Sequence, residues 1–353
     1  MDVPRTSDRT TIWTAAADLA AAGETAALAT VCRKRGSLPL ADDAKMLVSA
    51  LGRRMGTVGG GCVEADVIRQ ALETVRSGQP SVVRHTLNAD LAGDVGLSCG
   101  GTVDLFLEPL IPSAELVDLL RGVAESIAER QQVTVLTAVR WDNGPRKFAR
   151  AQGNAWSVGD WSGTLPWPPT GRRAAFVDDE SQLFVEPIHR TPRVIVFGAG
   201  HVGAEIAKLA ANAGFYVVVV DDRDEFANAT RLPWAHAVIA DDFNAVIDGL
   251  TFESDDFILA TTRGHQFDAT IIQRTAASGA GYVGMLGSAR KMSVVRKALL
   301  ESGVPADALD RVRCPIGEAI GADTPAEIAV SVVAELIRVR RSGPALKGGL
   351  GAE

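Results

Sequence analysis

Cysteine is scarce in this 353-residue chain, and the few cysteines lie far apart. The four are Cys32, Cys62, Cys99 and Cys314, and no two of them form a C-x-x-C pair. Zinc ribbons and cysteine-ligated iron–sulfur clusters require closely spaced cysteines, so the spacing argues against both kinds of site. We expect free thiols in a reducing compartment, with Cys32 and Cys314 buried, as most free cysteines are.

Long hydrophobic runs and an excess of positive charge are also missing. The net charge of −7 argues against a nucleic-acid or membrane-surface partner, because both attract basic patches. No apolar run approaches the ~18 residues that a membrane span needs, so we expect a cytoplasmic protein. The chain is 46% hydrophobic and 22% charged, which is typical of a globular protein with a core. At about 100–200 residues per domain, its length suggests two domains.

Glycine is concentrated in one informative motif. Residues 194–203 read Val-Ile-Val-Phe-Gly-Ala-Gly-His-Val-Gly, a strand-like apolar run followed by G-x-G-x-x-G. A helix-forming segment at 204–213 and a second apolar run at 215–220 follow, in the order of a dinucleotide-binding β-turn-α-β unit. The glycines let the backbone approach a pyrophosphate at the helix N-terminus, and an acid about 20 residues further on bonds a ribose hydroxyl. The candidate ligand residues are Gly198, Gly200, His201, Gly203, Asp221 and Asp222.

The rest of the second half alternates strand and helix patterns, which predicts a Rossmann-like parallel sheet with helices on both faces. Ligands of such sheets bind beyond the carboxyl ends of the strands, so residues after two further expected strands join the site. They are Arg263, His265, Gly287 and Ser288. His265 is a candidate acid–base group because an unperturbed imidazole titrates near ~6.5, and a capping histidine is the alternative.

The first half predicts a smaller mixed α/β domain. We expect it over residues 1–187, followed by a linker at 188–192, the Rossmann-like domain at 193–341 and a flexible tail at 342–353. Two clusters join glycine to cysteine, and a basic segment lies upstream of them. The clusters are Gly59-Gly60-Gly61-Cys62 and Cys99-Gly100-Gly101, and the upstream residues are Arg35, Ser37 and Lys45.

Cys62 directly precedes a helical pattern, and a helix N-terminus lowers the pKa of a thiol. We therefore predict an anion site with one or two accessible thiols, formed by Cys62, Cys99 and the residues around them. The alternative is that the glycines only make tight turns while the cysteines pack in the core.

Motifs in both halves carry a family resemblance. In the first half they are Arg35-Gly36-Ser37-Leu38-Pro39, Ala44-Lys45-Met46-Leu47-Val48, Gly59-Gly60-Gly61-Cys62-Val63-Glu64 and Cys99-Gly100-Gly101. In the second half they are the segments 261–268, 284–291, 315–317 and 320–329. In this order the motifs resemble those of the xanthine dehydrogenase accessory (XdhC/CoxI) family.

The resemblance implies a factor that binds molybdenum cofactor, assists its sulfuration and inserts it into an apo molybdenum hydroxylase. It also implies a sulfur-donor partner and a homodimer. Cys62 and Cys99 would then be cofactor- or sulfur-handling thiols able to contact molybdenum, with no metal site made by protein ligands alone.

Two alternatives stay open: an NAD(P)-binding oxidoreductase and a nucleotide-sensing module. Whether the chain itself catalyses a reaction also stays open. One departure from the family pattern bears on the ligand: Asp42 and Asp43 stand where the family has a Pro/Gly-rich loop, and their carboxylates would repel an anion.

Overall fold

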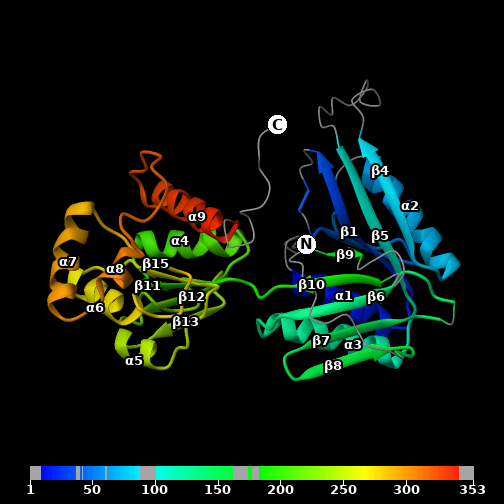
Figure 1. Cartoon of the computed structure of the whole chain (residues 1–353), viewed down its shortest axis with the longest axis horizontal. Helices are drawn as coiled ribbons and strands as arrows, with labels where there is room; N and C mark the ends of the chain where they lie inside the picture. Colours follow the sequence, from blue (N-terminus) through cyan, green and yellow to red (C-terminus); the bar gives the residue numbers. More distant parts are fainter. Residues whose placement is uncertain are drawn as a thin grey trace. The chain divides into compact units, whose positions relative to one another are not determined.

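The structure is a computed structural model, and it describes residues 9–36, 40–41, 43–59, 62–87, 101–142, 144–161, 174–176 and 183–341. The chain divides into two compact units, Met1–Arg190 (unit 1) and Thr191–Glu353 (unit 2). Unit 1 runs from blue to green in Figure 1, and unit 2 runs from green to red. Within the described ranges, no helix combines the length and apolar character needed to cross a membrane.

Unit 1 contains two antiparallel sheets in its described residues, each with five strands. The strands are β1 (Ala26–Gly36), β2 (Lys45–Ser49), β3 (Arg54–Gly56), β4 (Ser81–Leu87), β5 (Gly101–Leu110), β6 (Val133–Ala138), β7 (Lys147–Ala151), β8 (Asn154–Val158), β9 (Ala175–Phe176) and β10 (Leu183–Ile188). Sheet A has the order β3-β2-β1-β5-β4, and sheet B has the order β8-β7-β6-β10-β9.

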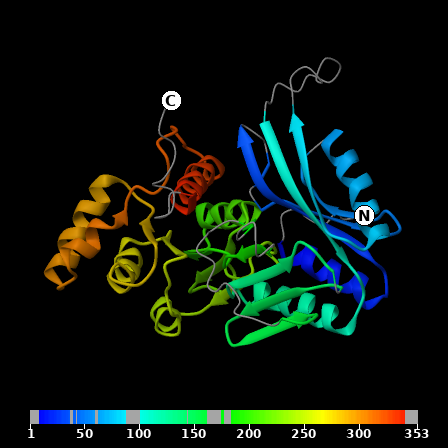
Figure 2. The same ribbon diagram turned by 45° about the vertical axis from the view of Figure 1, so that its right-hand side comes forward.

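Helices pack on both faces of sheet A because its strands place apolar side chains at alternate positions on opposite faces. In β1, Ala27 lies in the core with α2 (Cys62–Ser77), which covers one face. Leu28 lies in a second core with α1 (Arg9–Ala21), α3 (Ala114–Ala128) and side chains of sheet B. The helix α2 runs beside the strands of sheet A in both views (Figures 1 and 2).

Two ion pairs cross between the sheets of unit 1. The Lys45 Nζ of β2 lies 2.7 Å from Glu186 Oε1 of β10, and the Lys147 Nζ of β7 lies 2.6 Å from Glu108 Oε1 of β5. All four side chains are at most 10% exposed. Both ammonium groups lie over the buried Trp13 ring, at 5.5 and 5.6 Å from its centroid. We call these four charged residues the buried charge layer.

Unit 2 is built on one parallel sheet, as its alternating pattern predicts. The strands are β11 (Arg193–Phe197), β12 (Tyr216–Asp221), β13 (Ala237–Ala240), β14 (Asp256–Ala260), β15 (Tyr282–Met285) and β16 (Val312–Arg313). Their order in the sheet is β13-β12-β11-β14-β15-β16, and every neighbouring pair is parallel. This confirms the predicted Rossmann-like architecture.

Helices cover both faces of the unit 2 sheet. The helices α4 (His201–Asn212) and α9 (Pro325–Arg341) pack on one face. On the other face lie α5 (Phe243–Asp248), α6 (His265–Thr275), α7 (Ala289–Glu301) and α8 (Ala306–Asp310). Figure 2 separates the two groups, with α4 and α9 above the sheet. The four central strands β11, β12, β14 and β15 are buried on both sides, so they read as nearly continuous apolar runs in the sequence.

Candidate functional site

The glycine turn lies where the strand order of unit 2 reverses. Strand β11 has β12 on one side and β14 on the other, and the turn follows it directly. Such a switch point leaves a crevice beyond the carboxyl ends of the strands, which is where Rossmann ligands bind. Gly198 has a φ of +110°, and a Cβ there would lie 2.5 Å from the Thr261 carbonyl oxygen. Only glycine lets the turn lie this close to the end of β14.

The other two glycines of the motif have opposite surroundings. A Cβ on Gly203 would lie 1.9 Å from the Gly198 carbonyl oxygen, so this glycine permits α4 to pack against the turn. A Cβ on Gly200 would meet no atom within 4 Å. Gly200 is the N-cap of α4, and the exposed His201 is the first helical residue. Gly200 therefore has open space beside it and lies at a helix N-terminus, the end of a helix that favours a phosphate.

Asp221, at the end of β12, is occupied by groups of its own chain. Its Oδ2 accepts from the Ala199 N–H at 2.7 Å, and its Oδ1 accepts from the Arg223 Nε at 2.9 Å. Burial alone would raise the pKa of this carboxyl, but the bonds from Arg223 and Ala199 outweigh burial and lower the pKa. Asp221 thus ties the second strand to the glycine turn, and its ribose contact remains a prediction.

Asp222 is the more accessible of the two carboxylates. Its side chain is 25% exposed, against 2% for Asp221. Its Oδ2 accepts from the Arg263 Nη2 at 2.9 Å, which joins the end of β12 to the loop after β14. The structure therefore brings Asp222 and Arg263 together at the mouth of the crevice.

Two arginines beside the turn were not singled out from the sequence. The Arg223 and Arg231 guanidinium carbons lie 3.7 and 4.9 Å from the centroid of the Phe226 ring. Arg231 also donates to the carbonyl oxygen of Ala199, inside the glycine motif. Arg223 directly follows Asp222 in the sequence. This position next to a strand end was the only feature of the sequence that could have indicated a role for Arg223 in the site.

The loops after β14 and β15 close on a buried carboxylate. Asp268 is fully buried and accepts from the Thr262 N–H and Oγ1 at 3.0 and 2.7 Å. Its other oxygen lies 2.5 Å from the Lys291 Nζ. Ser288 is the N-cap of α7 and accepts from the Lys291 N–H at 3.2 Å. Gly287 lies against the Lys291 side chain, where a Cβ would be 2.6 Å from Cδ.

Some predicted residues lie outside the described part of the chain. These are Ser37, Gly60, Gly61 and Cys99. Cys62 is the first residue of α2, as its sequence context predicts, and His265 is the first residue of α6. The side chains of both residues are outside the described part. Gly59, with a φ of +138°, precedes α2.

The two described basic residues of the predicted anion site have different surroundings. Lys45 belongs to the buried charge layer, where it also donates to Thr30 Oγ1 at 2.8 Å. Burial lowers the pKa of its ammonium group, against the attraction of Glu186. Arg35 instead lines a pocket of about 250 Å³. We call this the arginine pocket, and its lining residues are Arg33, Arg35, Arg84, Thr86, Thr102 and Asp104.

The thiols and carboxylates of the described residues do not form a metal site. Among these residues, no group of three or more His, Cys, Asp or Glu side chains has the arrangement to hold a metal ion. Cys32 and Cys314 are free and partly buried. Both thiols are less buried than the usual burial of free cysteines led us to expect.

The fold and the turn define an α/β protein with an intact Rossmann unit that follows an antiparallel two-sheet unit. Residues 194–336 match the family model described as the XdhC Rossmann domain, and residues 19–86 match the XdhC and CoxI family model. The chain belongs to the XdhC and CoxI family.

Similar proteins cover nearly the whole chain. A protein of Bacillus subtilis named as a probable xanthine dehydrogenase component is 29% identical over 90% of this chain and 94% of its own length. The molybdenum cofactor insertion chaperone PaoD of Escherichia coli is 25% identical over 95% of this chain and 90% of its own. A crystal structure described as a xanthine dehydrogenase from Bacillus halodurans has a TM-score of 0.76 at 28% identity, covering 94% of this chain and 96% of that one.

Proposed function

We propose that this chain is an accessory factor for a molybdenum hydroxylase of the xanthine dehydrogenase type. It binds the molybdenum cofactor transiently and inserts it into the apo-enzyme. Membership of the XdhC and CoxI family supports this role, as does similarity to a protein named as a molybdenum cofactor insertion chaperone. The structural observation that carries the proposal is the open side of Gly200 at the switch point of an otherwise closely packed turn.

The ligand of unit 2 carries a diphosphate and a ribose. The diphosphate lies over Gly200 at the N-terminus of α4, where the backbone N–H groups and the helix dipole favour negative charge. Asp221 already accepts hydrogen bonds from Arg223 and Ala199. The ribose hydroxyls therefore hydrogen-bond to Asp222, which Arg263 holds in place. The nucleotide is either part of the molybdenum cofactor or a separate NAD(P).

In unit 1, Cys62 and Cys99 handle sulfur or contact the metal end of the cofactor. The position of Cys62 at the start of α2 supports this role, because a helix N-terminus favours the thiolate form. In this proposal a sulfur-donor protein supplies the sulfur, the chain acts as a homodimer in the cytoplasm, and the apo-hydroxylase is the acceptor.

An NAD(P)-dependent oxidoreductase or a nucleotide sensor is the second candidate. The strand order of unit 2 is that of dinucleotide-binding Rossmann folds, which supports it. The two candidates differ in the ligand that leaves the protein on denaturation. An accessory factor yields a pterin and molybdenum, whereas an oxidoreductase or sensor yields a pyridine nucleotide or another free nucleotide.

The test is mass spectrometry of ligand released from gently purified full-length protein, with molybdenum measured by elemental analysis. Gly200→Val should abolish ligand retention, while its circular dichroism spectrum stays that of the folded wild-type protein. Gly249→Val is the matched control, because Gly249 is an exposed residue at the C-cap of α5 with a φ of −84° and only ordinary contacts. Release of a pyridine nucleotide without pterin or molybdenum would contradict the accessory role.

A second measurement tests the thiols. Cys62→Ala protein, loaded with molybdenum cofactor, should transfer it to apo-hydroxylase but yield less sulfurated, active enzyme. Equal activation by wild type and Cys62→Ala would remove Cys62 from the mechanism. Light scattering of the same samples reports whether the chain is a dimer.

A further inference from the structure

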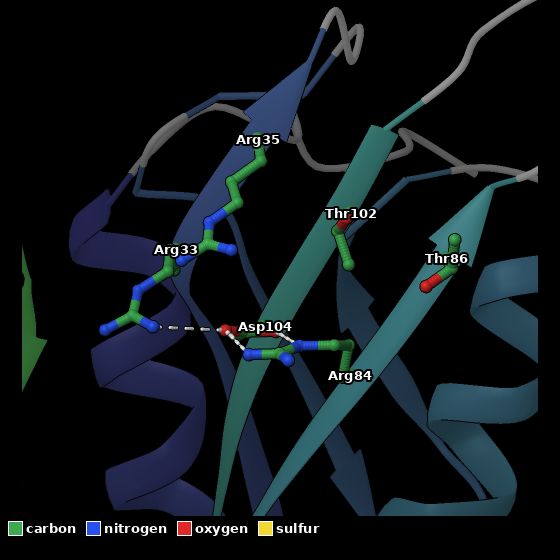
Figure 3. A pocket seen from close by; sticks show the side chains of 6 residues that line it. All are labelled: Arg33, Arg35, Arg84, Thr86, Thr102 and Asp104. Carbon is green, nitrogen blue, oxygen red and sulfur yellow. Dashed lines mark hydrogen bonds and ion pairs between the residues drawn. The ribbon is translucent and has the colours of Figure 1, made fainter.

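The arginine pocket draws on three neighbouring strands of sheet A, namely β1, β5 and β4. The strand registers set its side chains in two rows across the sheet. The rows are Arg33–Asp104–Arg84 and Arg35–Thr102–Thr86. Figure 3 shows Arg33 and Arg84 reaching Asp104 from its two sides, with Arg35 and the two threonines in the neighbouring row. All six side chains therefore share one face of the sheet.

A β-bulge puts the two β1 arginines on this face. The pairing of β1 with β5 shifts between Val31 and Arg33, which makes Cys32 an extra residue. Val31 packs toward α2, so without the bulge the alternation would turn Arg33 and Arg35 to that side as well. Bulges of this kind re-aim side chains and are frequent beside functional sites.

The Cys32 side chain holds the bulge to the neighbouring strand. Its Sγ donates to the Asp104 carbonyl oxygen at 3.1 Å. Burial, followed by the nearby Asp104 charge, raises the pKa of this thiol to about 12, so it stays protonated and can keep donating.

The pocket carries more positive charge than its own carboxylate can balance. The Arg84 Nε and Nη2 donate to the two Asp104 oxygens at 2.6 and 2.9 Å, and the Arg33 Nη1 lies 3.8 Å from Oδ2. Arg84, followed by Arg33 and Arg35, lowers the pKa of Asp104 against its burial, so it is charged at neutral pH. Three guanidinium groups minus one carboxylate leave a net charge of +2 among the lining residues.

Several donors of the pocket have no partner within the described part of the chain. No hydrogen bond or ion pair there involves the Arg35 guanidinium, and the Thr86 and Thr102 hydroxyls make no side-chain hydrogen bond to another described residue. Arg33 and Arg84 are also accessible, with side chains 53% and 59% exposed. Asp104, which is 9% exposed, fixes these two arginines in place while leaving part of each guanidinium free to donate.

We propose that the arginine pocket binds a terminal phosphate group, a tetrahedral dianion. Guanidinium forks match phosphate oxygens, and the surplus of two positive charges matches the charge of a phosphate monoester. A carboxylate would leave one of those charges unbalanced. Ligand pockets that enclose a whole drug-sized molecule have about 300–1,000 Å³, so the pocket's volume of about 250 Å³ suits the phosphate end of a larger ligand.

The experiment is isothermal titration of the full chain with inorganic phosphate, with acetate at the same ionic strength as the comparison. Arg35→Gln removes a guanidinium that holds no ion pair among the described residues, so the fold should be unaffected. Phosphate binding should weaken at least tenfold in this variant, because it loses charge-assisted hydrogen bonds. The phosphate affinity of Arg35→Lys should lie between those of wild type and Arg35→Gln, because lysine keeps the positive charge but lacks the two-pronged guanidinium group.

The matched control is Arg69→Gln on α2, an exposed arginine that pairs with Asp66 outside the pocket. It should leave phosphate binding unchanged. The titrations are repeated in the Gly200→Val background, which removes any phosphate binding at the glycine turn of unit 2, and the loss caused by Arg35→Gln should persist there. Equal losses in Arg35→Gln and Arg69→Gln, or phosphate binding no tighter than acetate, would overturn the proposal.

Molybdate, another tetrahedral dianion, serves as the competing probe. Phosphate binding that depends on Arg35 supports the proposal whether or not molybdate competes. Binding of molybdate without phosphate would overturn the assignment to a phosphate group. Inorganic phosphate titration needs neither molybdenum cofactor nor hydroxylase, so its failure would leave the proposed accessory function untouched, and the reverse also holds.

Discussion

Two charged clusters lie on the same face of sheet A, and they differ in whether their charges cancel. Glu108 of the buried charge layer and Asp104 of the arginine pocket are four residues apart on β5, so both side chains point to one side. The buried layer holds two lysines and two glutamates, all at most 10% exposed, and each ammonium has a carboxylate partner. The pocket is open and keeps a surplus of two positive charges.

The difference separates charges that hold the protein together from charges that can receive a ligand. A buried ion pair must be complete, because an unpaired charge in a low-dielectric interior is costly. An exposed cluster can leave charge unbalanced at little cost to stability, since water solvates it. The same contrast recurs in unit 2, where Gly203 and Asp221 are enclosed by their own chain while Gly200 and Asp222 are accessible.

The largest expected effect comes from breaking the buried layer. Lys147→Met leaves the Glu108 carboxylate buried without its ammonium partner, so we expect unfolding to become easier by about 3–5 kcal/mol. Urea unfolding followed by tryptophan fluorescence measures this, because five of the six tryptophans precede residue 190. The double variant Lys147→Met/Glu108→Leu should recover most of the loss. A single-variant cost no larger than that of an exposed pair would break the comparison.

The next effect in size is at the third glycine of the turn. In Gly203→Ala the new Cβ would lie 1.9 Å from the Gly198 carbonyl oxygen, a backbone atom that cannot move without disturbing β11 or α4. We expect a loss of about 1–3 kcal/mol, the usual cost of overpacking, in the unfolding transition of unit 2. Far-UV circular dichroism during urea unfolding detects it. An unchanged midpoint would mean that the turn is looser than its geometry indicates.

Gly203 and Lys147 also show which features of the fold could be predicted from the sequence and which could not. The glycine motif, its strands and its helix were predictable because strand, turn and helix are adjacent in the chain and each has a local signature. The ion pair between Lys147 and Glu108 was not predictable from the sequence. The two residues are 39 positions apart, and only the strand pairing of two sheets brings them together. For the same reason Lys45 was assigned to an anion site without any sign of its partner Glu186.

The arginine pocket was only partly predictable. Arg35 was singled out as an anion ligand, but four other lining residues come from β4 and β5, far along the chain from β1. They are Arg84, Thr86, Thr102 and Asp104. The strand β1 also continues beyond Val31, through the bulge, to Gly36. A bulge adds one residue without changing the composition of the strand, so the alternation pattern gave no sign that Arg33 and Arg35 share a face with Asp104.

The contribution of the enclosed Asp221 to stability should depend on pH. Asp221→Asn keeps the shape of the side chain but weakens its bonds to Arg223 and Ala199, so we expect a loss of about 1–2 kcal/mol at pH 7. The folded-state pKa of Asp221 is lowered, so its contribution is complete above the pKa of the unfolded chain and is lost as the pH falls through the folded-state value. Wild type and variant should therefore differ by the full amount at all pH values above the ordinary aspartate pKa of 3.8, and converge only as the pH falls below it. A gap that widens on acidification would contradict the assignment.

The smallest effect on stability, and a large one on binding, is expected at Gly200. Its φ of −62° is accessible to any residue, and a Cβ there meets no atom within 4 Å. Gly200→Ala should therefore lower the free energy of unfolding by about 0.5 kcal/mol or less, since the only loss is that alanine is a poorer N-cap than glycine.

The methyl group would, however, occupy the space over the helix N-terminus, where a phosphate must approach the backbone. Titration with ADP and with NAD should show at least tenfold weaker binding than in wild type, while Gly249→Ala, the control at the C-cap of α5, binds normally. If Gly200→Ala instead unfolds the protein as readily as Gly203→Ala does, the distinction between enclosed and accessible residues fails in unit 2.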